Sequence, residues 1–274
     1  MTQIKEQQRE IINALMREAT MSSMAIGTGL THIRQYDFTC TGFFYSGVLS
    51  FTIGIERLLK LILIYDYRLN NKDAFPNDEY LRQYRHKLNN LIGKAREINK
   101  NQSLDVDDSF FDQDVLYQQL IAFLSDFAEQ ARYYNLDFLT GKRQYGPEPL
   151  ARWDKEICTE IVKRHYRPNQ RRLGRKKLLA NELENTNLVH ILHVREDGSR
   201  ISNVTDLFMQ EDLIPTKQKY SMYYLYTISR FPSNLLARLE SKGTFYPYLS
   251  EFFMIFRCDD KNDILQTKTW YPMQ

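Results

Sequence analysis

The feature that most constrains the fold is a stripe of apolar side chains between residues 81 and 98. Its members recur at steps of three and four, the spacing that places side chains on one face of an α-helix. Asn77 or Asp78 can cap the start of such a helix. A helix with one apolar face must cover that face with other helices, so the stripe predicts a helical bundle. It consists of Leu81, Tyr84, Leu88, Leu91, Ala95 and Ile98.

Three other segments have helical patterns. Residues 43–66 are strongly apolar, and Glu56 and Lys60 stand four apart, the spacing of an ion pair on a helix. Apolar residues keep helical register over 116–131, and Pro149 can open a further helix over 150–161. We therefore expect a mainly α fold, an antiparallel helical bundle. Its buried residues should include Leu81, Leu88, Leu91, Phe123 and Phe127.

The C-terminal part has a less regular pattern. We expect the bundle to occupy residues 1–165, and a basic segment with a mostly helical subdomain packed on the bundle to occupy 166–274. Leu188 to Val194, the turn Asp197-Gly198, and Arg200 to Val204 favour a β-hairpin, although a short helix ending at Gly198 fits the same residues. Helices are expected over 217–230 and 233–242, with Pro232 in a first turn. The tyrosine-rich stretch 221–231 is more typical of a core than of a base-stacking surface.

Sequence composition bears on membrane insertion, cellular location and cofactor binding. Glu56, Arg57 and Lys60 interrupt the apolar stretch 43–65 near its middle, which predicts a buried amphipathic helix and no membrane insertion. The N-terminus lacks the apolar core of a secretory signal, and the 3 cysteines are widely spaced. These features favour reduced thiols and a cytoplasmic location. They predict no metal or cofactor, because His190 and His193 lack a nearby carboxylate and the motif after Gly27-Thr28-Gly29 lacks its further glycine.

The segment 163–177 is the most distinctive charged stretch. Eight of its 15 residues are Lys or Arg and none is acidic, although the net charge of the chain is only +3. Arginine forks match phosphate oxygens, and Tyr166 offers a ring for stacking. The segment therefore indicates binding to nucleic acid or another polyanion, with a solvated loop as the alternative. The candidate nucleic-acid-binding residues are Lys163, Arg164, Arg167, Arg171, Arg172, Arg175, Lys176 and Lys177.

Three motifs between residues 43 and 140 resemble the HEPN superfamily of small helical bundles found in bacterial toxin–antitoxin and abortive-infection systems. Glu56 and Lys60 are similar to the E-x-x-x-K pair of that family's early helix. His86, Leu88 and Leu91 are similar to its H-x-L-x-x-L helix, and Arg132 to the arginine of its late helix. The resemblance covers about a third of the chain.

HEPN ribonucleases carry an arginine and a histidine separated by four to six intervening residues, and the pair stabilises the phosphorane and transfers protons. None of the 5 histidines of this chain has that spacing. The resemblance therefore implies a protein that binds RNA or nucleotides without catalysis, in phage defence or a toxin–antitoxin setting, and that can form a homodimer. Two alternatives stay open. One is a protein-interaction scaffold that docks an acidic partner, and the other is a metal-independent ribonuclease with an unusual site formed by Arg82, Arg85, His86 and Arg132.

Overall fold

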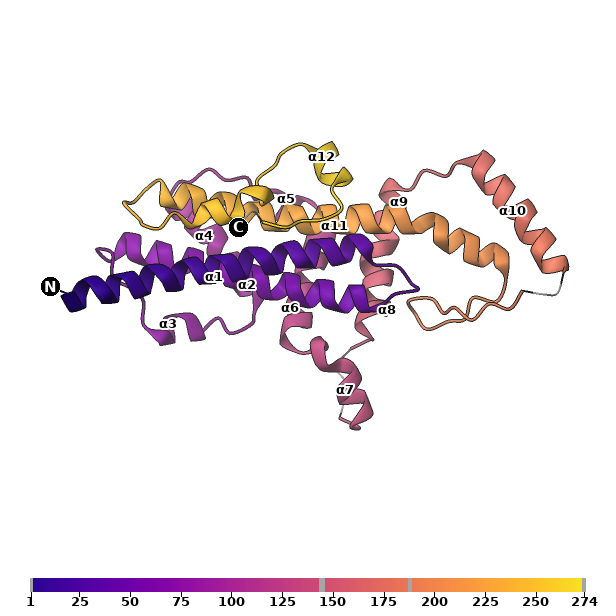
Figure 1. Ribbon diagram of the computed structural model, residues 1–274, viewed down its shortest axis with the longest axis horizontal. Coiled ribbons are helices and arrows are strands. Elements are labelled where there is room, and N and C mark those ends of the chain that lie inside the picture. Colours follow the sequence, from indigo (N-terminus) through magenta and orange to yellow (C-terminus); the bar gives the residue numbers. More distant parts are fainter. Residues whose placement is uncertain (1, 143–145, 187–188, 273–274) are drawn as a thin grey trace.

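A computed structural model describes residues 2–142, 146–186 and 189–272 as an elongated helical molecule without a β-strand in these ranges (Figure 1). The mainly α bundle predicted from the sequence is confirmed. The elements are α1 (Thr2–Gln35), α2 (Gly42–Asn70), α3 (Asp78–Arg82), α4 (Leu88–Asn101), α5 (Phe110–Gln113), α6 (Val115–Glu129), the 3₁₀ turn η1 (Ala131–Tyr133), α7 (Tyr134–Leu139), α8 (Pro149–Trp153), the π-helical turn η2 (Asp154–Cys158), α9 (Thr159–His165), α10 (Gln170–Asn185), α11 (Val204–Glu240), the 3₁₀ helix η3 (Leu249–Phe256) and α12 (Lys261–Gln266).

Helices α1 and α2 form the central antiparallel pair, and glycines let their backbones approach closely. A Cβ atom on Gly29 would lie 2.6 Å from the Cβ of Phe51, and one on Gly54 would lie 2.6 Å from the backbone nitrogen of Ile26. Any larger side chain at either position would force the two helices apart. Gly29 is therefore a packing residue within α1.

One continuous core joins the N-terminal and C-terminal parts of the chain. Helix α11 packs against both α1 and α2, and its tyrosine-rich stretch is buried, with Tyr226 fully covered. The prediction that this stretch belongs to the core is confirmed. Leu88, Leu91, Phe123 and Phe127 are also buried as expected, and Leu81 is partly buried at the edge of the core. The predicted division between residues 165 and 166 stays a prediction.

The prediction of one continuous helix beneath the apolar stripe is wrong. Helix α3 ends at Arg82, a turn follows, and α4 begins at Leu88. Arg85, in that turn, has a φ of +42°, a backbone conformation outside the right-handed helix. The three-and-four spacing continues across the turn because Leu81 and Tyr84 still contact the core, but they contact it from a separate segment.

The predicted pair of C-terminal helices is a single helix, α11, with Pro215 and Pro232 inside it. A proline in a helix removes one backbone hydrogen bond and costs about 3 kcal/mol. Phe231 and Leu235 on either side of Pro232 are buried, so the tertiary packing holds both flanks in one helix. Pro232 is itself covered by the core and does not begin a new helix.

The predicted β-hairpin is not formed in the described residues. A turn at Asp197-Gly198 is present, and a single antiparallel bridge joins Val194 to Arg200, without strands on either side. Leu192 is 93 % exposed, so this segment has no core against which an apolar strand face could pack. Residues 189–194 are not helical either, and Leu188, where the predicted strand began, lies outside the described residues.

The apolar stretch of α2 is buried inside the bundle, as the sequence predicted. Of the helices that the structure describes, none has an apolar run long enough to cross a membrane.

Candidate nucleic-acid interface

The basic segment spans three structural elements. It begins in the last turn of α9, continues through an extended loop over 166–169, and enters α10. Asn169 caps α10, because its side-chain oxygen accepts a hydrogen bond from the backbone nitrogen of Arg172 at 3.1 Å. Figure 1 shows α10 at the end of the molecule far from the N-terminus. The arginines and lysines of α10 are therefore carried on a projecting helix.

Carboxylates of the chain hold three of the eight predicted cations. Arg164 contacts Asp114 and Glu160, each at 2.7 Å, and these contacts raise the pKa of its guanidinium. Arg172 lies 3.1 Å from Asp212, and Lys176 lies 3.6 Å from the same carboxylate. These three side chains position α9 and α10 as well as contributing charge.

The other five predicted cations are exposed. Lys163 has only a long contact of 3.7 Å to Glu160, and 78 % of its side chain is accessible. Arg167 donates a hydrogen bond to the carbonyl of Tyr166 at 2.9 Å and otherwise faces solvent. Within the described parts of the chain, Arg171, Arg175 and Lys177 contact no carboxylate, and all three are exposed on α10.

Four of the cations line a groove along one side of α10. The groove has a volume of about 580 Å³ and is lined by Asn169, Arg171, Arg172, Arg175, Lys176 and Leu179. Asp212 can neutralise one of the four charges, so the groove keeps an excess of positive charge. A concave surface of this kind fits a chain of phosphates better than a flat charged face would, since several forks can converge on one backbone.

The aromatic residues beside the groove have partners inside the protein. The hydroxyl of Tyr166 donates to Asp212 at 2.6 Å, and burial together with that bond raises the pKa of Tyr166 to about 12. The ring of His165 stacks on Tyr220, with centroids 3.6 Å apart and an interplanar angle of 3°. Tyr166 is thus anchored through its hydroxyl, and the stacking role predicted for its ring stays a prediction.

The residues of the alternative ribonuclease site are divided among separate contacts. Arg82 pairs with Asp78 at 2.6 Å, whereas the Nδ1 of His86 lies 3.0 Å from Glu56. Glu56 also accepts a hydrogen bond from Lys60 at 2.7 Å, the helical ion pair expected from the sequence. Arg132 lies in η1 over the ring of Tyr133.

Arg82 and His86 do not share a helical face, because α3 ends at Arg82 and His86 lies in the turn before α4. Arg85 is exposed in the same turn. Figure 1 shows α3 and α7 apart along the molecule, and Arg132 precedes α7. The structure places Glu56, Lys60 and His86 together, and it places Arg132 in a different region.

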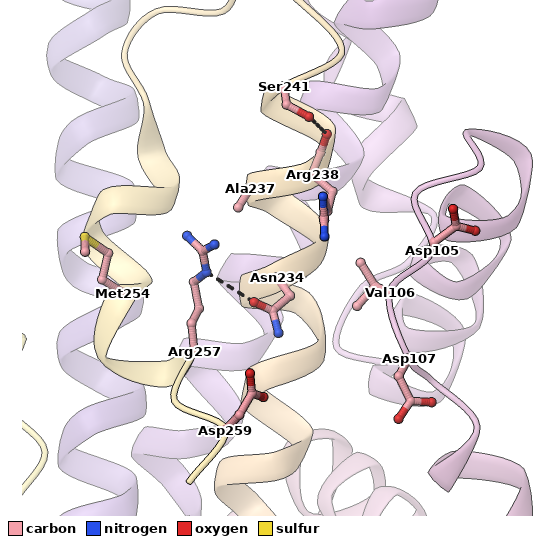
Figure 2. Close-up of a pocket in the computed structure, with 10 residues that line it drawn as sticks. All are labelled: Asp105, Val106, Asp107, Asn234, Ala237, Arg238, Ser241, Met254, Arg257 and Asp259. Carbon is pink, nitrogen blue, oxygen red and sulfur yellow. Dashed lines mark hydrogen bonds between the residues drawn. The ribbon is translucent and has the colours of Figure 1, made fainter.

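Sequence reasoning missed two polar clusters. One is buried, where Lys217 contacts Asp154 at 2.6 Å and Glu196 at 2.9 Å. The other is a groove of about 700 Å³ between α11, the segment after η3 and the loop after α4. Figure 2 shows Arg238 and Arg257 near Asn234, with Asp105 and Asp107 on the opposite wall. Both clusters draw residues from segments far apart in the chain, so no local spacing could have indicated them.

Comparison with protein-family models, with curated proteins and with solved structures gives no match for this chain. The HEPN resemblance therefore stays a prediction.

Proposed function

We propose that this protein binds RNA through the groove beside α10, without cleaving it. One observation carries the proposal: four cations line a single groove, and two of them, Arg171 and Arg175, contact no carboxylate of the described chain. Guanidinium groups are more weakly hydrated than ammonium groups, so unpaired ones on an exposed helix readily exchange water for phosphate oxygens. Arg172 and Lys176, held by Asp212, form the fixed wall of the same groove.

A polyanion fits this groove better than a single small anion does. Exposed cations continue beyond it to Arg167 in the loop and to Lys163 in α9, which has a long contact of 3.7 Å to Glu160. A row of separated charges matches the repeated phosphates of a nucleic-acid backbone, and such contacts are largely independent of sequence. A free nucleotide would reach only part of this row and should bind more weakly than a polymer.

The biological setting follows only from the resemblance. A HEPN-like bundle that binds RNA would suit a role in phage defence or a toxin–antitoxin pair. The same exposed cations could instead dock an acidic protein, and that second function predicts no preference for RNA.

The proposal is tested by reversing the two unpaired groove cations. We expect Arg171→Glu/Arg175→Glu to weaken binding to a single-stranded RNA by about tenfold or more, measured by fluorescence anisotropy at low salt, since each lost phosphate contact removes released counterions. Lys100→Glu/Lys268→Glu changes the charge equally at exposed positions outside the groove and serves as the control. Equal affinity of the two double variants would contradict the proposal.

Reversal of Arg172 or Lys176 is less informative. Both residues are bound to Asp212, and Lys176 also donates to the backbone carbonyl of Phe208 at 3.1 Å. Their substitution would disturb the attachment of α10 to α11 as well as the groove. Reversal of Arg171 and Arg175 changes the charge of the surface without breaking a contact in the described structure.

A further inference from the structure

The outer face of α10 has no partner in the described parts of the chain. Its inner face is attached to α11 through buried Ala180, through the contact of Lys176 with Phe208, and through Glu184, which accepts hydrogen bonds from the backbone of Val204 and Thr205. Opposite these contacts, the side chains of one helical face point to solvent. They are Arg171, Arg175, Leu178 and Glu182, at steps of four, three and four.

The order of side chains along this face is self-complementary. Leu178 is 67 % exposed and stands at the middle of the 16-residue helix, with Leu179 beside it at 47 %. Arg171 and Arg175 lie toward one end, and Glu182 lies toward the other. In the described structure neither Arg175 nor Glu182 forms an ion pair or a side-chain hydrogen bond. A large apolar side chain flanked by unpaired opposite charges is typical of a helix that packs against another helix.

We infer that α10 pairs with α10 of a second copy of this chain, in the antiparallel direction. A two-fold axis between Leu178 and Leu179 would bring the leucines of both copies together. The same axis places Arg175 of each copy opposite Glu182 of the other, because the two residues are equally distant from the centre in sequence. A two-fold interface repeats each contact, so both ion pairs form at once.

Gly174 supports the same face. It lies one turn before Leu178, and a Cβ added to it would meet no atom within 4 Å. A glycine inside a helix costs about 1 kcal/mol relative to alanine, and here the single chain offers no close approach that would require it. The absence of a side chain at Gly174 would let a helix of another molecule approach closely at this point.

The dimer differs from the proposed RNA site in the residues that it needs. Leu178 and Glu182 do not line the basic groove, whereas Arg171, Arg175 and Leu179 belong to both surfaces. Glu182→Arg should therefore weaken the dimer and leave RNA affinity intact or slightly raised. A wild type that binds RNA but stays monomeric would contradict only the dimer, and a dimer that binds no RNA would contradict only the RNA site.

Charge exchange tests the pairing directly. Analytical ultracentrifugation of the full chain should show a reversible dimer with a dissociation constant roughly in the micromolar range, as expected of a small interface. Arg175→Glu and Glu182→Arg should each weaken it by at least about tenfold, because both place like charges opposite each other. Leu178→Asp should have the same effect, and circular dichroism should confirm that each variant is folded.

The decisive step is to mix the two single variants. A heterodimer of Arg175→Glu with Glu182→Arg has opposite charges at both positions, so the mixture should associate although neither variant does so alone. The double variant should likewise regain the dimer. The inference would be overturned if the wild type is monomeric at about 100 μM. It would also be overturned if the substitutions leave the dimer affinity unchanged, or if the mixture associates no better than its components.

Discussion

Glu196 and Lys217 form a buried ion pair in which the carboxylate oxygen and the ammonium nitrogen are 2.9 Å apart. Asp154 contacts the same ammonium at 2.6 Å, and the hydroxyl of Tyr36 donates to Glu196 at 3.1 Å. Tyr36 directly follows α1, Asp154 lies in the π-helical turn η2, Glu196 lies next to the turn at Asp197, and Lys217 lies in α11. This cluster therefore holds the N-terminal half of α11 and the turn at 195–200 against the bundle.

Replacement of Lys217 should destabilise the fold strongly. Lys217→Met leaves two carboxylates in a buried site without their cation, and loss of one partner from such a cluster typically costs about 3–5 kcal/mol. Urea unfolding followed by circular dichroism measures the change. Lys219→Met, on the same helix but without a carboxylate contact in the described structure, is the matched control and should change stability by less than about 1 kcal/mol. Equal effects would show that the cluster does not stabilise the fold.

The two ends of the apolar stripe should differ in their tolerance of charge. Leu88 is 1 % exposed, whereas Leu81 is only partly buried. Leu88→Asp should cost several kcal/mol because it buries a carboxylate without a partner, and Leu81→Asp should cost clearly less because its carboxylate can reach water. Thermal melting measures both. A Leu88→Asp variant that melts like the wild type would mean that α4 does not face the core.

Sequence patterns predicted which segments are helices better than where the helices end. The steps of three and four report which side chains meet the core, and they do so equally well when a turn such as 83–87 interrupts the helix. Pro232 indicated a boundary because local preference disfavours proline inside a helix, but the burial of Phe231 and Leu235 outweighs that cost.

The sequence predicted which cations form the candidate site, but it did not predict which of them form ion pairs. The run of cations was visible in the sequence, whereas the role of Asp212 was not, because Asp212 is forty residues from Arg172 and reaches it only through the packing of α10 on α11. The buried partners of Lys217 were hidden for the same reason. Ion pairs between distant segments have no local signature.

His165 should stay neutral in mildly acidic solution. Burial against Tyr220, and the cations Lys261, Arg164 and Arg167, lower its pKa from the ordinary 6.5 to about 4. The unfolded chain therefore binds more protons than the folded chain between these values. Stability should be full above about pH 6.5 and should fall as the pH approaches 4. His165→Phe should remove this part of the pH dependence, and NMR titration of the imidazole should report the pKa directly.

Bound RNA should raise the pKa of His165. Phosphates near Arg167 would offset the positive charges that now disfavour the imidazolium. The NMR titration repeated with saturating RNA should therefore show a higher pKa, and the weakly binding Arg171→Glu/Arg175→Glu variant at the same RNA concentration should show a smaller change. An unchanged pKa in the wild-type complex would place RNA away from the loop that carries Arg167.

The purified protein should not cleave RNA. His86 contacts Glu56, and Arg132 lies on another part of the bundle, so the proton-transfer group and the cation that HEPN-type cleavage needs are not held together. Several RNAs should be incubated with and without divalent metal, with His86→Ala as a control for contaminating nuclease. Cleavage by the wild type that disappears in His86→Ala would support the ribonuclease alternative, since acid–base chemistry contributes about 10²- to 10⁴-fold.

The salt dependence of RNA binding tests the central claim most directly. If the groove and its neighbouring cations bind phosphates, a plot of log K against log salt concentration should fall linearly with a slope of roughly −3 to −4, since each contact to a single strand contributes about −0.7. The Arg171→Glu/Arg175→Glu variant should lose about 1.4 of that slope, and Lys100→Glu/Lys268→Glu should keep it. Absence of measurable RNA binding, or a slope that is the same in the wild type and the groove variant, would contradict the account.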